Sequence, residues 1–127
     1  MARTTGGQVG SIGADNLIAG IYPPPVTQVF DLKTSGIIER GTVLGRGADG
    51  KYFVLGAKTG TGTSATAIEG TASVIVAETT EEDDEIVVAY ISGHFYRNGL
   101  IVADDYELTE ADENNLRLAG IRLTDGI

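Results

Sequence analysis

Cysteine is absent from this sequence. Without thiols the chain forms neither a disulfide framework nor a metal site with thiolate ligands. The fold must therefore be held together by packing or by association with other chains.

Aromatic residues are also scarce. They make up 6% of the 127 residues, and tryptophan is absent, whereas glycine occurs 18 times. We therefore expect a core of valine, isoleucine, leucine and alanine, carried on short strands between tight turns. The length suffices for one domain with one core. The composition favours a small, mainly β domain.

Basic residues are outnumbered two to one. Nine basic against eighteen acidic side chains give a formal net charge of −9. This balance repels phosphate backbones and anionic membrane surfaces, so we expect no direct binding to nucleic acid or membrane. No stretch approaches the roughly 18 consecutive apolar residues of a membrane span, and the first 20 residues lack the continuous apolar segment of a signal peptide. We expect a chain that is neither membrane-spanning nor secreted through a signal peptide.

Residues suited to catalysis are few. His94 is the only histidine, and no serine or cysteine stands at a spacing that would complete a catalytic triad. One histidine also cannot supply the usual cluster of zinc ligands. The acidic run at residues 81–85 lacks the alternation and the glycine of a calcium loop, so it predicts a solvated turn. We expect no enzyme activity, no cofactor and no metal, with His94 packed at the surface or rim.

The segment "GRGADG" at residues 45–50 matches the G-x-G-x-x-G spacing of dinucleotide-binding turns. That motif requires a helix after the glycines, whereas residues 51–55 here are aromatic and β-branched. The pattern predicts a hairpin in which residues 37–44 and 51–55 are strands and Asp49-Gly50 lies in the turn. The following segment, "GAKTGTGTSAT" at 56–66, lacks a P-loop's G-K-[ST] and predicts a flexible surface loop.

Three further strands and one helix are expected. The strands are predicted at 26–32, 70–77 and 85–91, the last two joined by the acidic turn. For the helix, Thr109 is a suitable N-cap with Asp112 at the third position, and Gly120 ends it, which predicts a helix over 110–119. A final short strand is expected at 121–123. The residues in and next to this helix that are expected to share one apolar stripe are Leu108, Ala111, Leu118 and Ala119.

The N-terminal region is rich in glycine, serine and threonine and poor in apolar residues. Such a composition does not form a core by itself, so residues 1–21 are predicted to be a flexible N-terminal arm. "YPPPV" at 22–26 is a stiff spacer, since proline lacks the backbone N–H group. The domain itself is expected over residues 22–127.

The order of these signals is distinctive. A proline-containing extended segment is followed by "GTVLGR…GKYFVL", "AIEGTASVIVAE", "IVVAYISGHFYRNGLIV" and "LTEADENNLRLAGIRL". Over residues 22–127 this order resembles the bacteriophage head decoration protein family. The most specific pieces are Ser92-Gly93-His94-Phe95 and the helix that closes on Ala119-Gly120-Ile121. The sequence differs from the family pattern in its glycine-rich arm, its Gly/Thr loop and its lack of tryptophan.

The resemblance implies a β-clip-like domain of short strands with one short C-terminal helix and an extended N-terminal arm. It further implies a homotrimer on the outer surface of the virion capsid, at three-fold positions, that stabilises the expanded head without catalysis. The implied partner is the major capsid protein, and the protein would be made in the host cytoplasm. An alternative stays open: a virion or surface β-module that binds a carbohydrate or protein ligand through residues 56–66. The arm residues predicted to bind the capsid are Ile12, Leu17, Ile18, Ile21 and Tyr22.

Overall fold

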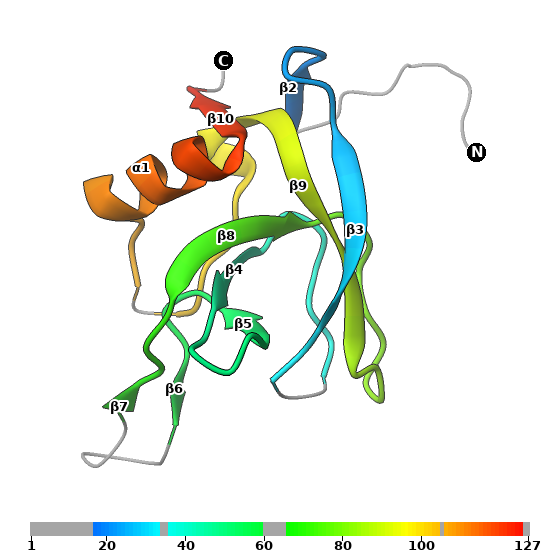
Figure 1. Ribbon diagram of the computed structural model, residues 1–127, viewed down its shortest axis with the longest axis vertical. Coiled ribbons are helices and arrows are strands. Elements are labelled where there is room, and N and C mark those ends of the chain that lie inside the picture. Colours follow the sequence, from blue (N-terminus) through cyan, green and yellow to red (C-terminus); the bar gives the residue numbers. More distant parts are fainter. Residues whose placement is uncertain (1–16, 34–35, 60–65, 105, 126–127) are drawn as a thin grey trace.

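The computed structural model describes residues 17–33, 36–59, 66–104 and 106–125 (Figure 1). It confirms a small, mainly β domain with one short helix. In the described part of the chain, seven strands form one sheet, and two short strands form a separate ribbon. The strands are β2 (Ile18–Gly20), β3 (Val26–Asp31), β4 (Val43–Arg46), β5 (Tyr52–Val54), β6 (Lys58–Thr59), β7 (Thr66–Ala67), β8 (Thr71–Val76), β9 (Ile86–Tyr96) and β10 (Ile121–Thr124); the helices are the 3-10 turn η2 (Arg97–Gly99) and α1 (Glu110–Ala119).

Strand β9 organises the sheet. Its first half pairs with β3 on one side and β8 on the other, and its second half pairs with β2 and β10. Among the strand pairs of this sheet in the described part of the chain, β9 with β10 is parallel and the others are antiparallel. Beyond β3, Leu32 bridges to Tyr52 on β5, so the sheet curls towards closure. Figure 1 shows β9 running beside β3 along one side of the molecule.

Both faces of the sheet centre are buried, which explains the nearly continuous apolar sequence of β8. Ile75 packs in one cluster with Phe95 and Leu116, whereas Val74 and Val76 pack in a second cluster on the other face. Successive side chains of a strand point to opposite faces, so a strand buried on both faces needs apolar residues at consecutive positions. These two clusters form the core of the domain.

Helix α1 spans the predicted residues. The Thr109 side chain accepts from the Asp112 N–H, the Asp112 side chain accepts from the Thr109 N–H, and Gly120 adopts a left-handed φ of 109°. The predicted apolar face is wrong except for Leu108, which packs against the core: Leu116 is fully buried, whereas Leu118 is 84% exposed. Residues two apart on a helix point about 200° from each other, so burial of Leu116 directs Leu118 outward. Ala111 and Ala119 are exposed as well.

The expected strands occur with shifted ends. The 45–50 segment does join two strands, but β4 begins at Val43, and residues 37–42 form no strand. In this segment a side chain, rather than a neighbouring strand, binds the backbone. The buried Thr80 hydroxyl accepts a hydrogen bond from the Ile38 N–H (2.8 Å) and donates one to the Gly36 carbonyl (2.7 Å). The predicted 56–66 loop contains the β6–β7 ribbon, with residues 60–65 outside the described part. Strand β9 continues to Tyr96, five residues further than expected.

Residues 17–20 belong to the domain, so the predicted arm of residues 1–21 is too long. Leu17 is only 3% exposed and lies in the core cluster around Phe95. Its carbonyl accepts a hydrogen bond from the Tyr96 N–H at 2.7 Å, and Ile18 pairs with Phe95. Backbone pairing with β9 and burial of Leu17 together hold residues 17–20 in the domain. Composition alone does not indicate either contact. Residues 1–16 lie outside the described part.

Candidate binding surface

The predicted capsid-binding residues fall into three groups. Leu17 is buried and Ile18 is half-buried, so neither side chain is presented at the surface. Ile21 and Tyr22 are 67% and 76% exposed. Ile12 lies outside the described residues. The structure therefore leaves Ile21 and Tyr22 as the exposed pair of the predicted set.

A proline-rich loop presents these two side chains. Strands β2 and β3 lie on the same side of β9, and residues 21–25 connect them. The three prolines at 23–25 lack N–H groups and cannot extend the ladder, so the chain leaves the sheet here. The Tyr22–Pro23 peptide bond is cis, and the Ser92 hydroxyl donates to the Pro24 carbonyl at 2.9 Å. The loop is thus attached to β9 while Ile21 and Tyr22 project from it.

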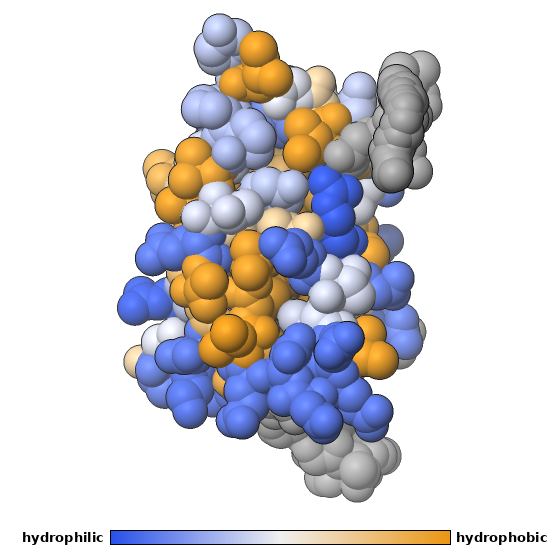
Figure 2. Space-filling view, turned by 90° about the vertical axis from the view of Figure 1, so that its right-hand side faces the viewer, coloured by the Kyte–Doolittle hydropathy of each residue, from blue (hydrophilic) through white to orange (hydrophobic). Residues whose placement is uncertain are grey.

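The exposed apolar surface continues along β3. Val26 and Val29 are 44% and 54% exposed, and Ile86 at the start of β9 is 53% exposed. Figure 2 shows apolar side chains gathered on the face of the molecule that carries β3, with hydrophilic residues around them. We call Val26, Val29 and Ile86 the β3 patch. The sequence does not distinguish these exposed residues from core residues, because both kinds are apolar residues within strands.

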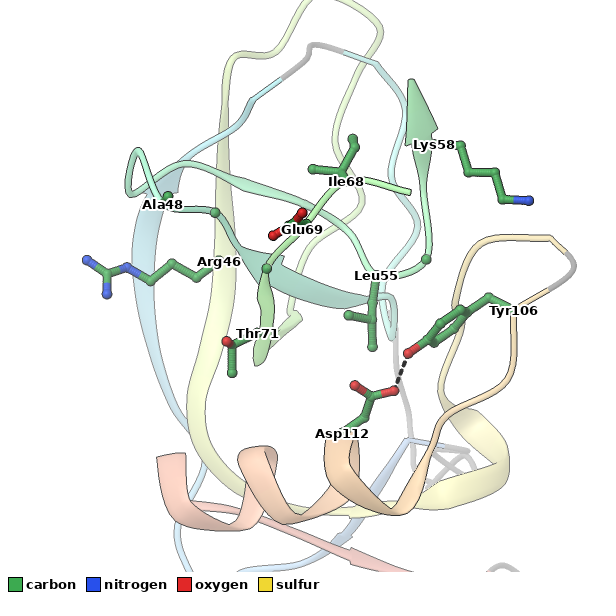
Figure 3. Close-up of a pocket in the computed structure, with 12 residues that line it drawn as sticks. Arg46, Ala48, Leu55, Lys58, Ile68, Glu69, Thr71, Tyr106 and Asp112 are labelled. Atoms are coloured by element: carbon green, nitrogen blue, oxygen red, sulfur yellow. Dashed lines mark hydrogen bonds between the residues drawn. The ribbon is translucent and has the colours of Figure 1, made fainter. Parts of the chain in front are cut away.

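A hollow of about 850 Å³ lies between the β4–β5 hairpin and the start of α1. Figure 3 shows the Tyr106 hydroxyl donating to Asp112 inside it, while the side chains of Arg46 and Lys58 extend away. Burial, followed by the hydrogen bond to Asp112, raises the pKa of Tyr106 to about 12. Tyr106 therefore stays protonated at neutral pH, and its hydroxyl is bound to the carboxylate that caps α1.

A second hollow, of about 590 Å³, lies beside α1 and β10 and is lined by three arginines. Arg97 is held by Glu113 through two hydrogen bonds of 3.0 Å, and Glu113 raises the pKa of that guanidinium. Arg117 donates to the Asn114 side chain at 2.9 Å. Two of the three guanidinium groups that line this hollow are therefore already bound: Arg97 links η2 to α1, and Arg117 bonds within α1.

The "GRGADG" segment lies in the β4–β5 hairpin, as predicted. Its backbone donors are used within the turn: the Gly47 N–H donates to the Lys51 carbonyl and the Gly50 N–H to the Gly47 carbonyl. Asp49 Oδ1 accepts from the Lys51 N–H at 3.0 Å. Strand β5, not a helix, follows the glycines. The arrangement therefore offers no helix N-terminus to a pyrophosphate.

His94 and the acidic run do not converge. His94 lies on β9 and is half-buried against Gly20; its Nε2 has no hydrogen-bond partner within the described residues. In the acidic turn, Asp84 Oδ2 accepts from the Glu81 N–H at 2.8 Å. Among residues 17–33, 36–59, 66–104 and 106–125, no three His, Asp or Glu side chains approach one another closely enough to hold a metal ion.

Comparison of the sequence with models of known protein families gives no match, and a search of curated proteins gives no match either. Within the described part of the chain, no helix has the length and apolar character needed to cross a membrane.

Proposed function

We propose that this protein is a structural virion protein that binds the outer surface of a bacteriophage capsid, as a trimer at three-fold positions, and stabilises the expanded head. The proposal rests first on the order of sequence signals that resembles the head decoration protein family. It is supported by a fold of the expected class, a small mainly β domain with a C-terminal helix.

The observation that carries the proposal is the exposure of Ile21 and Tyr22 on a loop attached to the sheet. Large apolar side chains this exposed gain free energy when a partner covers them; full burial of an isoleucine is worth about 1.5–3 kcal/mol. The gain per copy is small, because ordering the contact residues opposes it. Weak binding by each copy is sufficient on a capsid, where many copies bind and each stabilises the part of the shell that it contacts.

A three-fold position adds contacts between copies. In a closed ring of three, one patch of each copy meets a different patch of its neighbour. With a net charge of −9, copies repel one another as they come close, so apolar contact must outweigh this repulsion. The major capsid protein, by holding three copies in place, lowers the cost of bringing them together.

The test is direct binding to capsids. Purified full-length protein is mixed with undecorated expanded heads of the phage that encodes it, and the bound copies per head are counted. We expect saturation at three copies per three-fold position, visible as three-lobed density on the shell. If the wild-type chain does not bind, or binds as isolated single copies, the proposal is wrong.

A pair of matched variants tests the surface. Ile21→Asp places a charge on the exposed loop, and Leu118→Asp places the same charge at the most exposed apolar position of α1. Both should leave the melting temperature nearly unchanged. Only Ile21→Asp should reduce the copies bound per head. Equal binding by both variants would show that the loop does not contact the capsid.

A further inference from the structure

In the described part of the chain, strand β3 has an unpaired outer edge. Its inner side pairs with β9, and within the described residues no strand pairs with its outer side over residues 26–30. Past this stretch, the bridge from Leu32 to Tyr52 closes the gap to β5. An unpaired strand edge presents a row of N–H and C=O groups to which another strand can bind. The free stretch is five residues long, close to the usual length of a strand.

The antiparallel ladder identifies the backbone groups that face outward. The Leu32 N–H donates to the chain just before β9 at 2.9 Å. In an antiparallel pair, every second residue exchanges such bonds with its partner strand. Gln28 and Phe30 therefore bond to β9, whereas the N–H and C=O groups of Thr27 and Val29 point away from it.

The side chains at this edge are apolar on one face. Val29 lies opposite Val88 in the register, and Ile86 lies diagonally across on the same face. Val29 and Ile86 are each more than half exposed, and Figure 2 shows this face as an apolar area within a hydrophilic surround. An added strand with an apolar residue at every second position would cover the β3 patch.

The surroundings of the edge are acidic. Asp31 ends β3 on the same face as Val29 and lies opposite Ile86. Ile86 directly follows the acidic turn of residues 81–85, so this turn lies close to Asp31. The lysine nearest in the sequence, Lys33, is bound to Asp49 at 2.9 Å. The end of the edge nearest Asp31 therefore favours a basic residue in whatever binds there.

We propose that the outer edge of β3 binds an extended segment of another protein as an added strand, with apolar residues at alternate positions and lysine or arginine at the end beside Asp31. Main-chain hydrogen bonds to Thr27 and Val29 give the segment its register, and the β3 patch selects its side chains. A second copy of this chain is a poorer occupant, because its β3 has no lysine or arginine to place beside Asp31. The inference does not depend on capsid binding, since it concerns a different element and any partner of this chemistry.

The test uses a defined peptide and the full-length protein. The probe is a capped synthetic peptide of about six residues with alternating valine and threonine and a lysine at each end. Hydrogen exchange is followed at single backbone amides by NMR. On saturable binding, the amides of Thr27 and Val29 should exchange at least about tenfold more slowly, whereas those of Gln28 and Phe30, already paired with β9, should change little. Absence of saturable binding at millimolar peptide would overturn the proposal, as would protection confined to other residues.

Two controls separate strand addition from other binding. In Val29→Pro the outward N–H is removed, and proline is tolerated on an edge strand when its missing N–H faces solvent. Binding should be lost; unchanged binding to the folded variant would contradict backbone pairing. A second control changes the peptide and leaves the protein untouched. Two peptides are N-methylated, one at the odd residues and one at the even residues; the methyl groups of one peptide would face β3 and should abolish binding, whereas those of the other would face away and should not.

The charge assignment has its own test. A peptide with glutamate in place of lysine should bind more weakly, and equal binding would contradict the assignment.

Discussion

The Tyr106 hydroxyl donates a hydrogen bond to Asp112 Oδ2, the same oxygen that accepts from the Thr109 backbone N–H (3.0 Å) at the start of α1. One carboxylate thus completes the helix cap and fastens the preceding loop to it. The pair also lies in the larger of the two hollows, where it fills space beneath the β4–β5 hairpin (Figure 3).

The first prediction concerns the strength of this link. Tyr106→Phe removes the hydroxyl but retains the ring, and Asp112 keeps its bond to Thr109. We expect the free energy of unfolding to fall by about 0.5–1.5 kcal/mol, the usual net contribution of such a hydrogen bond. Asp112→Ala should cost more, because it removes the capping bond as well. Chemical denaturation measures both; an unchanged Tyr106→Phe variant would show that the link contributes nothing.

The second prediction is the pH dependence of the same link. The pKa of Tyr106 is raised from 10.0 to about 12 in the folded protein, first by burial and then by Asp112. Because the folded pKa exceeds the unfolded one, the stability from the protonated hydroxyl is fully present below pH 10 and is lost as the pH rises towards 12. The difference in unfolding free energy between wild type and Tyr106→Phe should therefore shrink over this range. A difference that stays constant from pH 9 to 12 would contradict the raised pKa.

The third prediction concerns a close approach inside β9. A Cβ at Gly93 would lie 2.5 Å from Cζ of Phe95, which is fully buried. Gly93→Ala must displace that ring and should cost about 1–3 kcal/mol. Gly36→Ala is the matched control: Gly36 also has a positive φ, 144° against 154°, but a Cβ there has no heavy atom within 4 Å. Similar losses in the two variants would mean that backbone strain, and not the ring, is responsible.

Local signals predicted the C-terminal part of the fold well. The bounds of α1 follow from Thr109, Asp112 and Gly120, which act on backbone groups within four residues of themselves. The buried face of the helix was predicted wrongly, because it depends on contact with β8 and β10 rather than on the helix itself. Leu118 has the composition of a core residue and yet is exposed; Leu116 was overlooked and is buried.

The candidate surface was predicted only in part. The prolines predicted a stiff spacer at residues 22–26. In the structure residues 21–25 form the loop that exposes Ile21 and Tyr22, and Val26 already belongs to β3. The free edge of β3 could not be predicted, since "VTQVFD" indicates a strand without indicating that it lies at an edge. That position is set by β9, which pairs with β3 across about sixty residues of intervening sequence.

The last prediction concerns Leu17, where the sequence and the structure disagree most. Composition placed Leu17 in a flexible N-terminal arm, but the side chain is 3% exposed within the Phe95 cluster. Leu17→Ala should therefore lower the free energy of unfolding by about 2–5 kcal/mol, the cost of deleting a buried leucine and leaving a cavity. Ile21→Ala, four residues later and 67% exposed, should change it by no more than about 0.5 kcal/mol. Denaturation of both variants, with capsid binding measured alongside, distinguishes the two roles: Leu17→Ala should reduce stability and Ile21→Ala should reduce binding. If Leu17→Ala unfolds like the wild type, the β2 segment is not part of the folded domain, and the predicted arm ends at residue 21 after all.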